Sequence, residues 1–277
     1  MIKDIVVNLP LIPERASTAR FAVSVAHRFQ AHLAGVAFVY DPILPAVDMG
    51  VAIPKSYVAE AQAAAQAKAD AAVADFEERV RRDGLSAGSH KFNVATVGAP
   101  TQFAQIARRF DLAIVSQSES DDDDGIDSAI AETTLFESGG PVLIVPYIQK
   151  DDLKLDRVAV CWDGSRPATR AIADAMPFIR QSKLTNILVV ENDQPKSSEL
   201  PGIDIARHIA RHGVNVELKT LPMTVDVGTT ILNFAADSSL DLLVMGGYGH
   251  SRLRQFILGG ATRSILESMT VPTLMSH

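Results

Sequence analysis

The sequence predicts an α/β protein made of two similar halves. Short β-branched runs alternate with longer helical patterns, and the same order of runs occurs twice along 277 residues, of which 47% are hydrophobic. Such alternation is typical of βαβ units, which build a parallel sheet covered by helices. We therefore expect a tandem repeat of two open, parallel, five-stranded sheets with flanking helices.

The first half is expected to hold five strands and four helices. The strands cover residues 2–8, 32–40, 91–96, 112–116 and 142–145, and the helices cover residues 15–30, 56–82, 101–109 and 126–137. In the long helix, apolar residues such as Val58, Phe76 and Val80 recur at helical spacing. This amphipathic pattern favours a helix that covers the sheet over one that recruits a partner.

The second half repeats this order. Its strands are expected at residues 157–162, 186–191, 215–220, 242–245 and 273–275, and its helices at residues 167–180, 198–212, 228–236 and 260–269. Between the halves, a polar stretch at residues 147–155 interrupts the apolar pattern after Pro146. Such stretches are typical of linkers, so we place the domains at residues 1–148 and 154–277.

The two halves align over their last segments. Asp111 and the four apolar residues after it match Asp241 and its four followers at an offset of 130 (241 − 111). The first strands are 153 positions apart, as Ile5 and Val158 are. The first half therefore carries about 23 extra residues, most of them within 56–82, which indicates an insertion in one repeat unit.

Composition narrows the classes of partner. The net charge is −7 and no block of Lys or Arg is present, whereas nucleic-acid binding usually needs a basic surface. No apolar run approaches the roughly 18 residues that span a bilayer, and the chain begins with a strand pattern instead of a signal peptide. We expect no nucleic acid, no membrane and a cytoplasmic location. The single Cys161 is interpreted as a small buried hydrophobic residue.

Glycines cluster on either side of a nine-residue stretch in the second half. Gly246, Gly247 and Gly249 follow a buried strand, and Gly259 and Gly260 open a helix after the nine residues. Without a Cβ, backbone N–H groups can approach phosphate oxygens closely, and the N-terminus of a helix favours negative charge. On this pattern alone, an anion site and a pair of tight turns are equally good interpretations.

The surrounding residues resemble the universal stress protein family. The family's ATP-binding signature is Gly-x-x-Gly, nine residues, Gly and a small residue, and here it follows the buried strand that ends at Met245. Asp163-Gly164-Ser165 after the first strand of this half, and the closing residues 270–275, also fit. The resemblance is good over residues 157–277 and weaker over residues 1–146. It implies a Rossmann-like fold of the adenine nucleotide alpha hydrolase type, with the two halves paired through their last strands as an intrachain pseudo-dimer.

The resemblance also implies one ATP, alone or with Mg²⁺, in the second half. Position by position, it places Asp163 near the ribose or a magnesium ion, and the backbone around Glu191 and Met245 beside the adenine. Against the phosphates and ribose it places Gly246, Gly249, Gly259, Gly260 and Ala261, with a further hydroxyl from Thr262. The family has Ser or Thr where this chain has Gly260. Loss of one hydrogen bond to a charged group weakens binding roughly ten- to a hundred-fold.

The first half lacks these features. At the same offset, the four signature glycines correspond to Ser116, Glu119, Ala129 and Ile130, and an acidic run at residues 119–124 would repel a triphosphate. We expect one nucleotide per chain. The acidic run either binds a divalent cation or forms a solvated loop, and it lacks the ligand spacing of an EF-hand.

The leading hypothesis is an ATP-binding protein of stress response or regulation. It would hydrolyse ATP slowly or not at all and present a nucleotide-dependent surface to a protein partner, because the sequence nominates no catalytic base. A nucleotide-free structural protein and an ATP-consuming enzyme are the alternatives, and monomer and homodimer both stay open. His208 and His212, four residues apart on a helix, are interpreted as a solvent-facing pair instead of metal ligands.

Overall fold

The first half contains the strands and helices that the sequence predicts, in the same order. The computed structural model describes residues 1–12, 17–42, 54–118, 125–191, 202–247 and 260–277. The elements of the first half are β1 (Asp4–Asn8), α1 (Ser17–Phe29), β2 (His32–Tyr40), α2 (Lys55–Arg82), β3 (Ala87–Val94), α3 (Ala99–Ala107), β4 (Leu112–Ser116), α4 (Ile126–Glu137) and β5 (Val142–Val145), with a 3-10 turn at Thr96–Gly98.

The second half repeats the pattern. Its elements are β6 (Arg157–Cys161), α5 (Arg166–Ile179), β7 (Leu184–Glu191), α6 (Ile203–Ala210), β8 (Val216–Pro222), α7 (Val227–Asp237), β9 (Leu242–Gly246), α8 (Gly260–Ser268) and β10 (Thr273–Ser276). Part of the helix expected at residues 198–212 lies outside the described residues. The α/β class and the flanking helices are confirmed.

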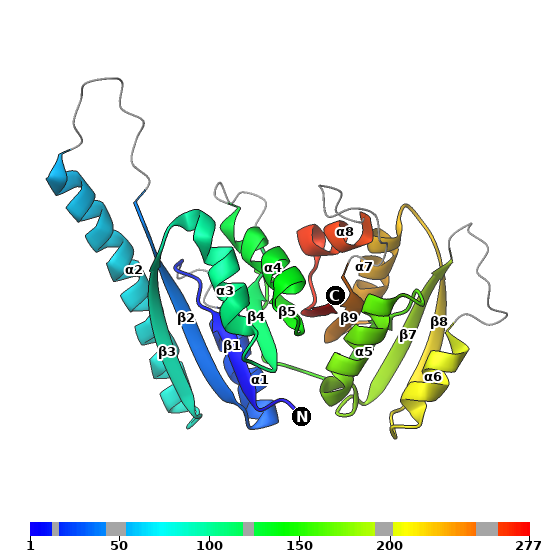
Figure 1. Ribbon diagram of the computed structural model, residues 1–277. Coiled ribbons are helices and arrows are strands. Elements are labelled where there is room, and N and C mark those ends of the chain that lie inside the picture. Colours follow the sequence, from blue (N-terminus) through cyan, green and yellow to red (C-terminus); the bar gives the residue numbers. More distant parts are fainter. Residues whose placement is uncertain (13–16, 43–53, 119–124, 192–201, 248–259) are drawn as a thin grey trace.

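Within the described residues, ten strands form one continuous sheet (Figure 1). The order is β3-β2-β1-β4-β5-β10-β9-β6-β7-β8. Strands within each half are parallel, whereas β5 and β10 are antiparallel, with Leu143 opposite Leu274. The two expected five-stranded sheets are therefore joined into one, through the last strand of each half.

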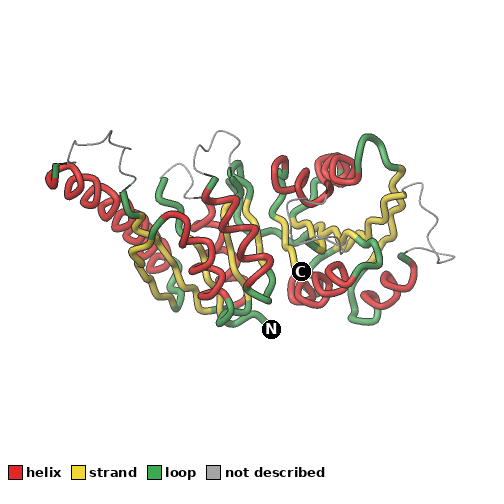
Figure 2. The backbone as a smooth tube through the Cα atoms, turned by 45° about the horizontal axis from the view of Figure 1, so that its top comes forward, coloured by secondary structure: helices red, strands yellow, loops and turns green. Residues whose placement is uncertain are grey.

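Helices cover both faces of this sheet, and each face has a core that extends through both halves. In the second half, Figure 2 shows helices on either side of the strands. One core contains Phe21 of α1, Phe76 of α2 and Phe178 of α5, and the other contains Phe103 of α3 and Ile265 of α8. Alternate residues of a strand point to opposite faces, so a single strand supplies both cores. In the described part of the chain, no helix is long and apolar enough to cross a bilayer.

The long helix α2 covers the sheet with only part of its length. Its buried residues are Ala69, Phe76 and Val80, whereas Tyr57 in the first turns is exposed. In Figure 1, the beginning of α2 extends past the end of the strands. The expected covering helix is therefore confirmed from about Ala69 onward.

Candidate functional site

The second half contains a topological switch point between β6 and β9. These two parallel strands are neighbours, with Val158 opposite Leu242, but the chain continues from β6 to β7 on one side and from β9 to β10 on the other. In open α/β sheets, ligands bind outside the carboxyl ends of the strands at such a point. Asp163 follows β6 and Gly246 ends β9, so both lie at this edge.

Gly246 allows β9 to end directly against the first turn of α5. A Cβ at this position would stand 2.4 Å from the backbone nitrogen of Ala168 and 2.6 Å from the carbonyl carbon of Pro167. Backbone atoms of a helix cannot move aside cheaply, so any side chain here would displace the strand or the helix. The glycine therefore has a packing role in addition to the phosphate role that the sequence suggests.

The segment that begins with Asp163 forms the start of α5. The carboxylate of Asp163 accepts a hydrogen bond from the backbone N–H of Ser165 at 2.9 Å, and Gly164 between them has a φ of +78°. The hydroxyl of Ser165 then accepts from the backbone N–H of Ala168 at 3.2 Å, which caps the helix. Asp163 remains exposed at the strand edge, where it is accessible to a ligand.

Gly260, Ala261 and Thr262 make up the first turn of α8. Gly260 is exposed, and among the described residues no atom outside its own helix turn lies within 4 Å of the place where its Cβ would stand. Ala261 is half-buried and Thr262 is buried. The first N–H groups of a helix have no partner within the helix, so an open first turn can accept an anion.

The remaining expected site residues are placed only in part. Met245 is buried in β9, and Glu191 is exposed at the end of β7, so both lie toward the same edge of the sheet as Gly246. Gly249, Gly259 and the acidic run at residues 119–124 lie outside the described residues. Their roles stay predictions.

Comparison with known proteins identifies the second half. Residues 154–277 match the sequence model described as the Universal stress protein family. These residues belong to that family. A universal stress protein from Synechocystis sp. is 24% identical over 140 residues, which are 48% of this chain and 46% of that protein. The chain therefore spans about half the length of the curated relative that it matches.

Solved structures share the fold over nearly the whole chain. A universal stress protein from Archaeoglobus fulgidus has a TM-score of 0.74 and 17% identity, with 99% of this chain and 96% of that chain covered. A functionally unknown protein from Pseudomonas aeruginosa PAO1 has a TM-score of 0.63 and 15% identity, with 99% and 92% covered. At these identities the likeness shows the fold, and the fold includes the first half as well as the universal stress protein domain.

The first half has side chains where the universal stress protein domain has glycines. Ser116 corresponds to Gly246, and its hydroxyl hydrogen-bonds the hydroxyl of Thr18 in α1 at 2.9 Å, with both residues buried. Ile130 corresponds to Gly260 and is a fully buried core residue of α4. The first half thus carries side chains, each with its own contacts, at two positions that are glycines in the second half.

Cys161 lies at the end of β6 in the universal stress protein domain and is half-buried. Desolvation, together with the nearby Asp163 carboxylate, raises the pKa of its thiol to about 12. The thiol is therefore protonated at neutral pH, which makes a nucleophilic role unfavourable.

We expect the Cys161 thiol of the folded protein to react with iodoacetamide at pH 8 more than about tenfold more slowly than the same thiol in urea. Because its pKa in the folded chain lies above the ordinary value of 9.0, the thiol supports stability fully below pH 9.0 and loses this support as the pH rises toward about 12. Mass spectrometry of the intact protein measures the alkylation. Equal rates in both states would contradict the burial of this thiol.

His208 and His212 lie on and just after α6, with ring centroids 5.1 Å apart. A guanidinium nitrogen of Arg180 lies 3.0 Å from Nδ1 of His212 and donates a hydrogen bond to it, because a guanidinium can only donate. Among the described residues, no group of three or more His, Cys, Asp or Glu side chains could hold a metal ion. The pair is better explained by this contact with α5 than by metal binding.

Proposed function

We propose that the universal stress protein domain of this chain binds one ATP, alone or with Mg²⁺. The observation that carries this proposal is the carboxyl edge of β6 and β9, where the glycine-bearing strand ends against α5 and α8 begins with the exposed Gly260. A ligand with several anionic oxygens suits such an edge, because backbone N–H groups at the start of a helix can donate to it. Family membership supports a role in stress response.

In this proposal, each described site residue has a defined contact. The first-turn N–H groups of Gly260 and Ala261 donate to phosphate oxygens, and the hydroxyl of Thr262 adds a further hydrogen bond. The exposed carboxylate of Asp163 accepts from the ribose hydroxyls or binds a magnesium ion, while backbone groups at Glu191 and Met245 border the adenine. The backbone of Gly246, with that of Gly249 and Gly259, lies against the phosphates and ribose.

The first half takes no nucleotide in this proposal. Two observations support this view: Ser116 and Ile130 replace signature glycines, and the Ser116 hydroxyl is already hydrogen-bonded to that of Thr18. The stoichiometry is then one ATP per chain.

The bound ATP serves as a signal and is hydrolysed slowly or not at all. No side chain is assigned as a general base or nucleophile, and the raised thiol pKa disfavours Cys161 as one. A nucleotide that stays intact can hold one conformation of the edge for a protein partner in the cytoplasm. Such a partner would bind the ATP-bound form in preference to the nucleotide-free form.

Isothermal titration with ATP and magnesium tests the binding. Replacement of Gly260 by serine is expected to tighten ATP binding roughly ten-fold, because a hydroxyl at the helix start adds a hydrogen bond to a charged phosphate. The described part of the chain leaves space for this side chain, since none of its atoms outside the same helix turn lies within 4 Å of the Cβ position.

Gly260→Ala is the matched control, because it adds the Cβ without the hydroxyl. It is expected to bind ATP as the native protein does. No heat with the native protein, and no adenine nucleotide in an acid extract of it, would favour the nucleotide-free interaction protein instead. Equal affinities for the serine and alanine variants would remove Gly260 from the phosphate site.

A further inference from the structure

The first half contacts the second half at Gly247, which follows β9, and at the last turn of α8. We propose that Gln117 and the end of α4, both from the first half, position α8 and Gly247 for nucleotide binding at the carboxyl edge of β9. The inference rests on the proposed function, because positioning matters only if this edge binds a ligand.

Gln117 holds the last turn of α8 from across the boundary between the halves. Its side-chain amide nitrogen donates to the backbone carbonyls of Leu266 at 3.0 Å and Glu267 at 3.3 Å. Only 2% of Gln117 is exposed. The last carbonyls of a helix have no partner within the helix, so this amide supplies a bond that α8 cannot make by itself.

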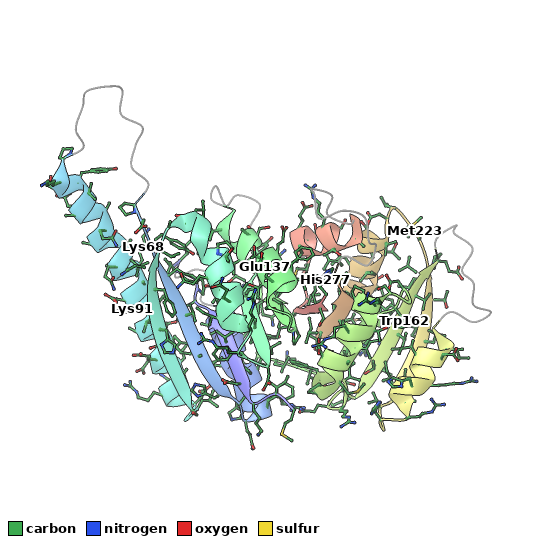
Figure 3. The ribbon with its side chains drawn as sticks, viewed as in Figure 1. Lys68, Lys91, Glu137, Trp162, Met223 and His277 are labelled. Atoms are coloured by element: carbon green, nitrogen blue, oxygen red, sulfur yellow. The ribbon has the colours of Figure 1, made fainter. Side chains whose placement is uncertain are left out.

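The end of α4 holds Gly247. Were a Cβ present at Gly247, it would stand 2.7 Å from a methyl carbon of Leu135, so the leucine lies in the space that a side chain would need. The carbonyl of Gly247 accepts a hydrogen bond from Nδ1 of His277 at 3.1 Å, and that ring packs edge-on against Phe136 at 5.0 Å. Figure 3 shows His277 beside the end of α4 that carries Glu137.

The two halves use matching positions for different purposes. Gln117 lies 130 positions before Gly247, the offset that aligns the halves. The N–H of each residue donates to a carbonyl at the end of the last strand, Val145 for Gln117 and Ser276 for Gly247, both at 2.8 Å. In a symmetric dimer both surfaces would make the same contact. Here the side chain of Gln117 donates to α8, whereas at Gly247 Leu135 occupies the space of a side chain.

This asymmetry gives the first half, which lacks the signature glycines, a role in the site of the second half. A ligand site binds most tightly when its donors are already in place before the ligand arrives. The amides of α8 point where the axis of the helix directs them, and Gln117 fixes that axis at its far end. Gln117 is therefore a positioning residue for the site, although it lies in the other half and touches no ligand.

Gln117→Leu tests this role, because leucine has a similar size but no donor for the two carbonyls. We expect ATP affinity to fall about five- to ten-fold in titration calorimetry, and amide hydrogen exchange in residues 260–268 to quicken. Gln181→Leu is the matched control. It removes another hydrogen bond between the halves, from Nε of Arg28 to Oε1 of Gln181 at 2.6 Å, that involves neither Gly247 nor α8.

The outcomes separate this inference from the proposed function. Native ATP affinity and native amide exchange in Gln117→Leu would overturn the positioning role of Gln117. Equal effects of Gln117→Leu and Gln181→Leu would also overturn it, because they would indicate a general weakening of the contact between the halves. If the native protein binds no ATP, the proposed function fails, and unchanged exchange in α8 would then overturn the positioning role separately. Should Gln117→Leu not fold, Leu135→Ala carries the test from the Gly247 side with the same expected loss of affinity.

Discussion

Replacement of Gly246 by alanine is expected to lower the free energy of unfolding by about 2–3 kcal/mol. The added Cβ would lie 2.4 Å from the backbone nitrogen of Ala168, so either β9 or the first turn of α5 must move. Urea denaturation followed by circular dichroism measures the change. The midpoint should fall while the slope stays constant, because the surface exposed on unfolding is the same.

Gly260→Ala is the control for this experiment. Both glycines belong to the same sequence signature, but no atom of another described element lies within 4 Å of the Cβ position at Gly260. The free energy of unfolding of Gly260→Ala should therefore differ from the native value by less than about 0.5 kcal/mol. A native midpoint for Gly246→Ala would show that β9 and α5 can separate without cost. Because a bulky residue at Gly246 disturbs the fold, loss of ATP binding in such a variant would not report on phosphate contacts. Gly260 is therefore the better position for the binding test.

The strands were predictable where they are buried on both faces. Residues 112–116 and 142–145 were expected as strands, and β4 and β5 have these same bounds, because a fully buried parallel strand is a continuous apolar run. The edge strand β3 begins at Ala87 instead of the expected residue 91. Its first residues are small or polar and carry no apolar signal, and pairing with the long β2, from Leu33 onward, extends the strand.

The candidate site was predictable as a motif but not as a set of contacts. The glycine pattern pointed to Gly246, yet the approach of α5 depends on how β9 packs against a helix almost eighty residues earlier in the sequence. At the offset of 130 residues, Gln117 aligns with Gly247, but the alignment could not reveal that Gln117 donates a hydrogen bond to α8. Contacts of that kind depend on the antiparallel pairing of β5 and β10, which sequence periodicity does not encode.

The two halves should also unfold together, because their cores are shared. Phe178 of α5 has no exposed surface and packs edge-on against Phe29 of α1, with ring centroids 4.7 Å apart. Truncation of a fully buried phenylalanine costs about 3–5 kcal/mol. We expect Phe178→Ala to lose about 4 kcal/mol in urea denaturation, through a cavity at the boundary between the halves.

Phe103→Ala makes the comparison decisive, because Phe103 is equally buried but lies wholly within the first half, against Phe38. The chain has one tryptophan, Trp162, which follows β6, so its fluorescence reports on unfolding of the second half. If the halves unfold as one unit, Phe103→Ala shifts the Trp162 transition as far as Phe178→Ala does. If the fluorescence midpoint stays at the native value while the circular dichroism midpoint falls, the halves unfold independently. Gln117 of the first half could then not position α8 of the second.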